Sequence, residues 1–164
     1  LIVSPYSPRR RFVQMIDREI AQAKSGGDAW MILKCNNLTD AGMIRKLYEA
    51  SRAGVDIKLI VRGACALRAG VKGLSENIEA YSIVGRFLEH ARVIAFGAGG
   101  KPEFYLSSAD WMTRNLDRRI EVPVFPFPAP PARWVRILAQ VYNDLADVVH
   151  LADALAEALT EEAV

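Results

Sequence analysis

The sequence predicts an α/β fold, a sandwich in which helices flank a largely parallel central sheet, with one long helix added at the C-terminal end. Three observations predict it. Apolar runs of strand length alternate with amphipathic stretches of helix length, and glycines separate many of them. The chain also has 164 residues, which is enough for one well-buried domain and few for two.

The first elements are expected to be a strand and a helix. Residues 1–3 are apolar and are followed by prolines, which predicts a short strand. In residues 8–24 apolar side chains recur every three or four positions until Gly26-Gly27, which predicts a helix over that range.

A strand, a helix and a second strand follow. Residues 30–34 predict a buried strand, and residues 55–61 predict another. Between them, residues 40–53 place apolar side chains on one helical face, and Gly54 suits the end of that helix. Residues 63–75 contain three glycines and predict a loop.

Four more strands are predicted, over residues 78–83, 92–96, 104–107 and 120–125. Ligands of sheets of this kind bind at the carboxyl ends of the strands. Arg62 comes directly after the strand predicted at 55–61, so it is expected at such a position.

The C-terminal part predicts a linker and a helix. Residues 1–122 form the expected domain, and the proline-rich residues 123–131 predict an extended linker. Residues 132–164 predict one helix, on the order of 40 Å long at about 1.5 Å per residue. Its apolar stripe is too wide for a two-stranded coiled coil, so we expect it to dock on the α/β body or on a neighbouring domain.

The distribution of charge favours an anionic ligand in the first part of the chain. Residues 1–122 carry 19 Lys/Arg against 13 Asp/Glu, whereas residues 123–164 carry 2 against 6. The excess is too small to argue for nucleic acid as a partner. The two cysteines form no metal-binding pattern and suggest free thiols in a reducing cytoplasm.

No apolar run is long enough to predict a transmembrane segment. The chain also starts without methionine, at residues that resemble a strand entered in the middle of a protein. We therefore expect a domain taken from a longer protein.

Residues 83–92 carry the most informative pattern. His90 lies in a strand-like apolar run between Arg86 and Arg92. An imidazole can donate a proton to a leaving oxygen, and guanidinium groups hold phosphate oxygens two at a time. If this run is a strand, His90 and Arg92 share a face, and a bound phosphate would offset their charges. The pattern predicts a phosphoryl-transfer site; a histidine with a purely structural role is the alternative.

The spacing His90-x-Arg92, followed by Ser107-Ser108-x-Asp110, resembles the His-x-Lys…Gly-Ser-x-Asn pattern of the phospholipase D superfamily. Arg92 stands where lysine is usual, and Gly97 occupies the position of the aspartate. The blocks around Arg62, Gly85–His90 and Ser108–Arg119 look like polyphosphate kinase of the long bacterial type, with residues 1–122 similar in order.

That resemblance implies a phospholipase D-like fold and a place as the last catalytic domain of an enzyme that makes inorganic polyphosphate reversibly from ATP. It implies that the phosphorylated histidine lies in a preceding domain. By position, His90 resembles the second active-site histidine, a proton donor or phosphate ligand. Arg62 is similar to a nucleotide-binding arginine and Arg119 to a further active-site arginine.

The resemblance implies further residues and partners. The remaining residues that it implies for ATP or polyphosphate binding are Lys34, Asn36, Arg86 and Ser108. It also implies Mg²⁺ with ligands not assigned, ATP or ADP and polyphosphate as substrates, the upstream domains of the same enzyme as partners, and a homo-oligomer of the full-length protein. Asp110 and Asp117 are candidates to bind magnesium or to pair with Arg114 and Arg118, and we favour the pairing.

Two other functions remain open. A phosphodiesterase or nuclease of phospholipase D type would work as a dimer of single histidine motifs, although the replaced lysine and aspartate argue against it. A polyanion-binding module would hold phosphate on the same arginines without turnover.

Overall fold

The computed structural model describes residues 8–83 and 85–117. The elements follow one another in the order α1 (Pro8–Lys24), β1 (Trp30–Cys35), α2 (Ala41–Arg52), β2 (Asp56–Val61), β3 (Ile78–Tyr81), β4 (Arg92–Phe96), β5 (Glu103–Ser107) and α3 (Thr113–Asp117). The sequence predicted each of these except α3, with bounds that differ by at most two residues. The strands predicted at 1–3 and 120–125, the linker 123–131 and the helix 132–164 lie outside the described residues.

The five described strands form one sheet in the order β3-β2-β1-β4-β5. β1 pairs with β2, and β2 with β3, in parallel, whereas β4 is antiparallel to both β1 and β5. β5 therefore runs in the same direction as β1, and β4 alone among the five is reversed. The predicted α/β fold with a largely parallel sheet is confirmed.

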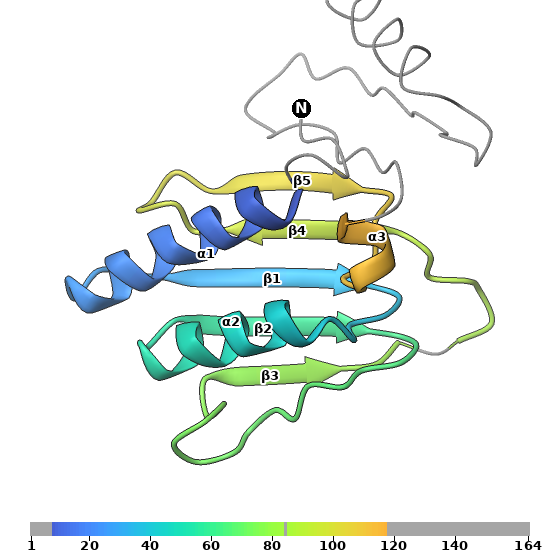
Figure 1. Ribbon diagram of the computed structural model, residues 1–164, viewed down its shortest axis with the longest axis horizontal. Helices are drawn as coiled ribbons and strands as arrows, with labels where there is room; N and C mark the ends of the chain where they lie inside the picture. The colour runs from blue at the N-terminus through green and yellow to red at the C-terminus, as the bar shows by residue number, and fades with distance from the viewer. Residues whose placement is uncertain (1–7, 84, 118–164) are drawn as a thin grey trace, which may run out of the picture.

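The reversal of β4 follows from its connections. The chain leaves β3 and enters β4 at the same end of the sheet, so β4 runs in the direction opposite to β3 (Figure 1). A short turn then leads directly from β4 into β5, as antiparallel neighbours allow. Gly99 and Gly100 in this turn have φ of 65° and 90°, and Ala98 has φ of 48°, a conformation that L residues rarely adopt.

Helices α1 and α2 both lie on one face of the sheet and cover its core (Figure 1). Phe12 and Ile16 of α1 and Met43 and Leu47 of α2 are fully buried. They meet alternate residues of the strands, among them Met31, Leu33, Ile57, Leu59, Ile94 and Phe96. Burial of this much apolar surface is the main force that holds the helices to the sheet.

The other face of the sheet is covered by no helix in the described residues. Its side chains include Lys34 and Ile60, which are partly exposed, and Phe104 and Leu106, which are about 40% exposed. The sequence predicted helices flanking the sheet, and the described helices flank one side of it.

Two residues define the ends of α2. The side chain of Asp40 caps its start, where it accepts a hydrogen bond of 2.9 Å from Met43 N. Gly54 follows the last turn with φ of 96°, as the sequence predicted for a glycine that ends this helix. Capping at Asp40 fixes the loop that joins β1 to α2.

None of the helices in the described part of the chain is long and apolar enough to cross a membrane.

Candidate functional site

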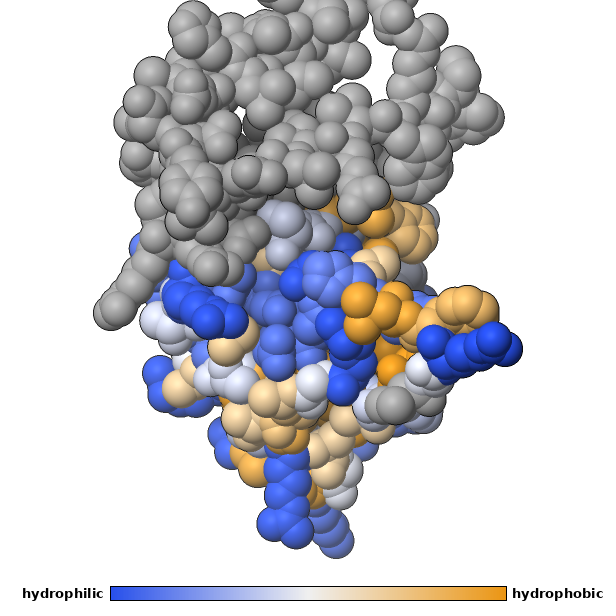
Figure 2. Space-filling view, turned by 90° about the vertical axis from the view of Figure 1, so that its right-hand side faces the viewer, coloured by the Kyte–Doolittle hydropathy of each residue, from blue (hydrophilic) through white to orange (hydrophobic). Residues whose placement is uncertain are grey.

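Polar side chains gather at the edge of the sheet where β1, β2 and β5 end and β4 begins. Asn36 follows β1, Arg62 follows β2, Asp110 comes shortly after β5, and Arg92 opens β4 with His90 just before it. Figure 2, which faces this edge, shows hydrophilic side chains at its centre with apolar side chains beside them. The sequence placed Arg62 at such a carboxyl end, and the structure brings the other groups to the same place.

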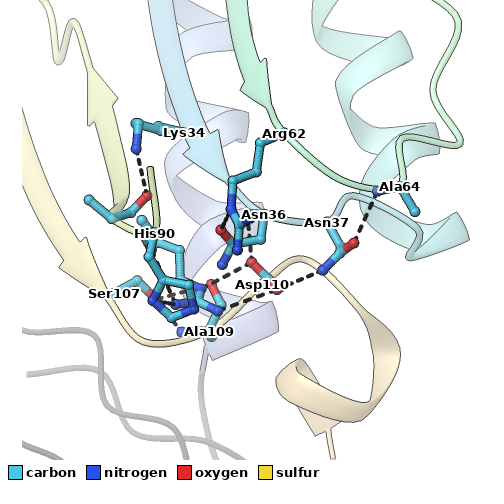
Figure 3. Close-up of polar contacts among 11 residues, drawn as sticks. Lys34, Asn36, Asn37, Arg62, Ala64, His90, Ser107, Ala109 and Asp110 are labelled. Carbon is cyan, nitrogen blue, oxygen red and sulfur yellow. Dashed lines mark hydrogen bonds and ion pairs between the residues drawn. The ribbon is translucent and has the colours of Figure 1, made fainter. Parts of the chain in front are cut away.

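Asp110 is the buried acceptor that joins these segments (Figure 3). Its Oδ1 accepts hydrogen bonds from Asn36 N at 2.8 Å and from Arg92 Nε at 3.0 Å. Its Oδ2 accepts one from Asn37 Nδ2 at 3.1 Å, and Arg92 Nη2 lies 3.5 Å away. Burial acts to raise the pKa of Asp110, but the hydrogen bonds from Arg92, Asn37 and Asn36 outweigh it, and the pKa is lowered.

His90 lies beside Arg92 at the open side of this network. Arg92 Nη1 is 3.3 Å from His90 Nδ1 and 3.4 Å from the carbonyl oxygen of His90. The expectation that His90 is part of a strand is wrong: it lies in the irregular segment before β4, which begins only at Arg92. The two side chains nevertheless meet, because the segment turns there with a hydrogen bond from His90 N to Leu88 O.

The positive charges around His90 lower its pKa. Arg92 is the main cause, followed by partial burial and by Arg62, while Asp110 acts in the opposite direction. Since the ordinary pKa of histidine is about 6.5, the ring is mostly neutral at pH 7. A bound phosphate would reverse part of this shift, because it would bring negative charge to the ring.

Arg62 is held by Asn36. The Arg62 Nε donates to Asn36 Oδ1 at 2.5 Å, and the guanidinium remains partly exposed. The buried Asn36 Nδ2 has no hydrogen-bond partner in the described structure.

The loop after Arg62 is locked to the loop after β1. Gly63 N donates to Asn36 O at 2.8 Å, and Ala64 N donates to Asn37 Oδ1 at 3.0 Å. A Cβ on Gly63 would lie 2.7 Å from both Asn36 O and Asn37 Oδ1, so only glycine fits without a shift of the backbone. Asn37 therefore has a structural role here, because its side chain holds the loop after Arg62.

Lys34 fastens the segment that carries His90. Its Nζ lies 3.3 Å from Glu89 Oε2 and donates to Ala91 O at 3.1 Å, as Figure 3 shows for the second contact. Lys34 therefore adds a positive charge close to His90 and positions its loop.

Arg86 and Ser108 are two further predicted site residues that the described part of the chain contains. Arg86 is exposed in the loop and takes part in no hydrogen bond or ion pair with the described residues. Ser108 is exposed close to Asp110. Arg119 lies outside the described residues.

The structure pairs the two aspartates with arginines that the sequence did not suggest. Asp110 pairs with Arg92, and Asp117 pairs with Arg9 of α1 at 2.7 Å. Neither forms an ion pair with Arg114 among the described residues, and Arg118 lies outside them. The interpretation that these carboxylates form ion pairs holds for both. The sequence assigned no role to Asn37, which donates a hydrogen bond to Asp110 and accepts one from Ala64 N. Its place next to Asn36, directly after a predicted strand, was a signal for it.

Comparison with known proteins gives a family. Residues 1–158 match the model of the family described as "Polyphosphate kinase C-terminal domain 2", beyond residue 122, where the resemblance seen in the sequence ends. The chain is 56% identical over 121 residues to a polyphosphate kinase of Thermosynechococcus vestitus. This match covers 74% of this chain and 16% of that protein. It is 46% identical over 162 residues to a polyphosphate kinase of Vibrio parahaemolyticus. This match covers 99% of this chain and 22% of that protein. The chain thus spans about a fifth of the length of these relatives.

Solved structures agree with this result. The crystal structure of polyphosphate kinase from Porphyromonas gingivalis matches with a TM-score of 0.74 and 44% identity, over 79% of this chain and 20% of that one. NucT from Helicobacter pylori and Nuc, a phospholipase D family member from Salmonella typhimurium, both match with a TM-score of 0.52. NucT is 15% identical to this chain, and the match covers 74% of this chain and 80% of NucT. Nuc is 14% identical, and the match covers 79% of this chain and 82% of Nuc. At this identity they show the fold alone, and they confirm that it is phospholipase D-like. The chain belongs to the polyphosphate kinase family, and it corresponds to C-terminal domain 2 of that family.

Proposed function

We propose that this chain is the C-terminal catalytic domain of an ATP:polyphosphate phosphotransferase. The reaction is the reversible transfer of the terminal phosphate of ATP to inorganic polyphosphate. One observation carries the proposal: in a chain of the polyphosphate kinase family, Lys34, Arg62 and Arg92 surround the exposed ring of His90 at the carboxyl edge of the sheet.

Phosphoryl transfer requires mainly positioning and stabilisation of negative charge. Arg62, fixed by Asn36, offers its remaining N–H groups to phosphate oxygens. His90 contributes as a proton donor or phosphate ligand. Arg119 follows Asp117, the last residue of α3, by two positions, and we propose that it adds a further positive charge to the phosphates.

We propose that the nucleophilic histidine lies outside this chain, in an upstream domain of the same enzyme. An apolar surface beside the site supports this. Phe87 and Leu88, three and two residues before His90, are 80% and 71% exposed, and Ile83 and Tyr81 nearby are about half exposed. Apolar groups so exposed next to a site mark an interaction surface. Further partners in this proposal are ATP or ADP, polyphosphate and further copies of the full-length protein, in the cytoplasm.

Magnesium enters the proposal only with the nucleotide phosphates. The described residues contain no group of three or more His, Cys, Asp or Glu that could hold a metal ion. Both carboxylate oxygens of Asp110 already accept hydrogen bonds. The described residues therefore do not fit a magnesium site of their own.

A thermal-shift experiment tests the proposal. The 164-residue chain is heated with ATP, with polyphosphate and with double-stranded DNA of equal charge, and then incubated with ATP labelled on its terminal phosphate. We expect stabilisation by ATP and polyphosphate that exceeds stabilisation by DNA, and no acid-labile phosphoprotein. Addition of the upstream domains should restore the transfer of phosphate to polyphosphate.

Other outcomes would contradict the proposal. Stabilisation without any transfer after the upstream domains are added would favour a polyanion-binding module. Cleavage of DNA would favour a phosphodiesterase, and stable labelling of His90 would contradict its role beside a separate nucleophile.

A further inference from the structure

We propose that Asp110 and Arg92 are positioning residues that hold His90 as a neutral imidazole with its proton on Nε2. His90 then acts as a hydrogen-bond donor to a phosphate oxygen and does not transfer a proton. This inference rests on the proposed function, because it states what His90 does within that site.

Arg92 can contact the ring of His90 only as a hydrogen-bond donor. An arginine side chain has five N–H donors and no acceptor. Arg92 Nη1 lies 3.3 Å from His90 Nδ1, so this contact is a hydrogen bond only when Nδ1 offers its lone pair. In a neutral ring the proton must then be on Nε2.

Asp110 holds Arg92 in place. Two of its nitrogens face the two oxygens of Asp110, Nε with Oδ1 at 3.0 Å and Nη2 with Oδ2 at 3.5 Å, and Nη1 is left for His90 (Figure 3). The side chains of Arg92 and Asp110 are only 16% and 7% exposed. Asp110 is fixed in turn by Asn36 N and Asn37 Nδ2.

This arrangement needs a guanidinium. The fork of arginine can bind a carboxylate with two nitrogens and a third group with the remaining one, whereas the ammonium group of lysine is a point charge on a flexible stem. The arginine that stands in place of the lysine of the phospholipase D pattern therefore has a physical reason: it links Asp110 to His90.

Positive charge around His90 also favours the neutral ring. The groups that face His90 are Arg92, Arg62 and Lys34, all positive, and Asp110, which is turned toward Arg92. Glu89 of the same loop is paired with Lys34. A second proton, on Nδ1, would point at the guanidinium and add a positive charge among three others. The neutral ring is therefore favoured, and its free Nε2–H is suited to a phosphate oxygen on which negative charge develops.

Nitrogen NMR of the histidine rings tests this directly. The chain contains only two histidines, His90 and His150, and a His150→Gln variant assigns their signals. In the 164-residue chain at pH 8, we expect Nε2 of His90 to be the protonated nitrogen and Nδ1 to be unprotonated, with no mixture of tautomers. A mixture, or a proton on Nδ1, would overturn the proposal.

Variants separate charge from geometry. Arg92→Lys keeps the positive charge but loses the fork, so we expect a low pKa for His90 with mixed tautomers. Arg92→Gln removes both the charge and the fork, so we expect it to give mixed tautomers and also to raise the pKa of His90. Asp110→Asn should give mixed tautomers in a folded chain, and Glu103→Gln is the matched control, because it weakens the similar Arg18–Glu103 pair at the opposite edge of the sheet. If Asp110→Asn does not fold, Arg92→Lys alone decides: an unchanged single tautomer in that variant would overturn the role of the fork.

Turnover gives a second readout in a full-length polyphosphate kinase that carries this chain. We expect Arg92→Lys to lower kcat roughly a hundredfold with a small change of KM, since a misplaced group costs about that much. His90→Gln keeps an N–H donor but cannot transfer a proton, so it should retain more activity than His90→Ala. Equal loss in these two variants would contradict hydrogen-bond donation. A fixed tautomer in an enzyme without polyphosphate synthesis would instead refute the proposed function alone.

Discussion

The guanidinium of Arg9 joins Asp40 and Asp117, which lie 77 positions apart in the sequence. Arg9 donates to both oxygens of Asp40 and, with Nε and Nη2, to both oxygens of Asp117, each at 2.7 Å. Asp40 begins α2 and Asp117 ends α3, so one side chain of α1 holds two loops that border the site. Arg9 is partly buried by these contacts, whereas the neighbouring Arg10 and Arg11 are exposed.

Replacing Arg9 should destabilise the chain. Arg9→Gln leaves the buried carboxylate of Asp40 with only Met43 N and Thr113 Oγ1 as donors. A buried acceptor that loses its partner costs about 1–3 kcal/mol. Urea unfolding of the 164-residue chain measures the loss, and Arg10→Gln, at an exposed neighbour, should change the free energy of unfolding by less than about 0.5 kcal/mol. Equal effects of the two changes would contradict the structural role of Arg9.

The stability of the chain should fall in acid because of the same pair. The hydrogen bonds from Arg9 are the main reason that the pKa of Asp40 lies well below its ordinary value. For such a carboxylate, the stabilisation is complete above the ordinary pKa of about 3.9 and is lost as the pH falls below it. We expect unfolding experiments at pH 6, 4 and 3 to show a decrease that Asp40→Asn reduces. An unchanged pH dependence in this variant would assign acid sensitivity to other groups.

Removing Arg62 should weaken substrate binding. A hydrogen bond to a charged group contributes about 1.5–3 kcal/mol, so Arg62→Ala should raise the Kd for ATP or polyphosphate about tenfold or more. Added salt should weaken binding by the wild-type chain in the same direction. Arg45→Ala, which removes an exposed arginine from the outer side of α2, is the control. Titration calorimetry that gives the same Kd for Arg62→Ala and Arg45→Ala would remove Arg62 from the site.

Deleting residues 130–164 should expose apolar surface. The expectation that this segment docks on the α/β body or on a neighbouring domain rests on its wide apolar stripe, and it stays a prediction, since the segment lies outside the described residues. The sheet face that carries Phe104 and Leu106 is free of helices in the described part of the chain. We expect the fragment 1–129 to aggregate in light scattering more readily than the complete chain. A soluble, monomeric and equally stable fragment would show that the segment is an independent appendage.

The elements could be predicted from the sequence because their signals are local. Pro8 and Gly26-Gly27 bound α1, and Asp40 and Gly54 bound α2, by rules that act within a few residues. The reversed direction of β4 could not be predicted, because it depends on which strand pairs with which. Helix α3 has five residues and is too short to show a period.

The residues of the candidate site could be predicted from the sequence better than the contacts among them. Arg62 follows a strand and His90 stands in a recognisable motif, so both could be proposed from the sequence, and the structure places them at the same end of the sheet. The partners of Asp110 and Asp117 were not, because Arg92 is 18 positions from Asp110 and Arg9 is 108 positions from Asp117. Such pairs depend on how the strands and helices are arranged, which neighbouring residues do not encode.

In the proposed function, His90 belongs to the catalytic machinery of a polyphosphate-forming enzyme. The most direct test is the rate of polyphosphate synthesis from ATP by the full-length enzyme with His90→Ala, measured with its melting temperature and compared with the exposed control Arg45→Ala. We expect the rate to fall about 10²–10³-fold with almost no change in Tm, because the exposed ring donates a hydrogen bond to the reacting phosphate and contributes little to folding. A rate that remains at the wild-type value, or one that falls only as far as the protein unfolds, would contradict the claim.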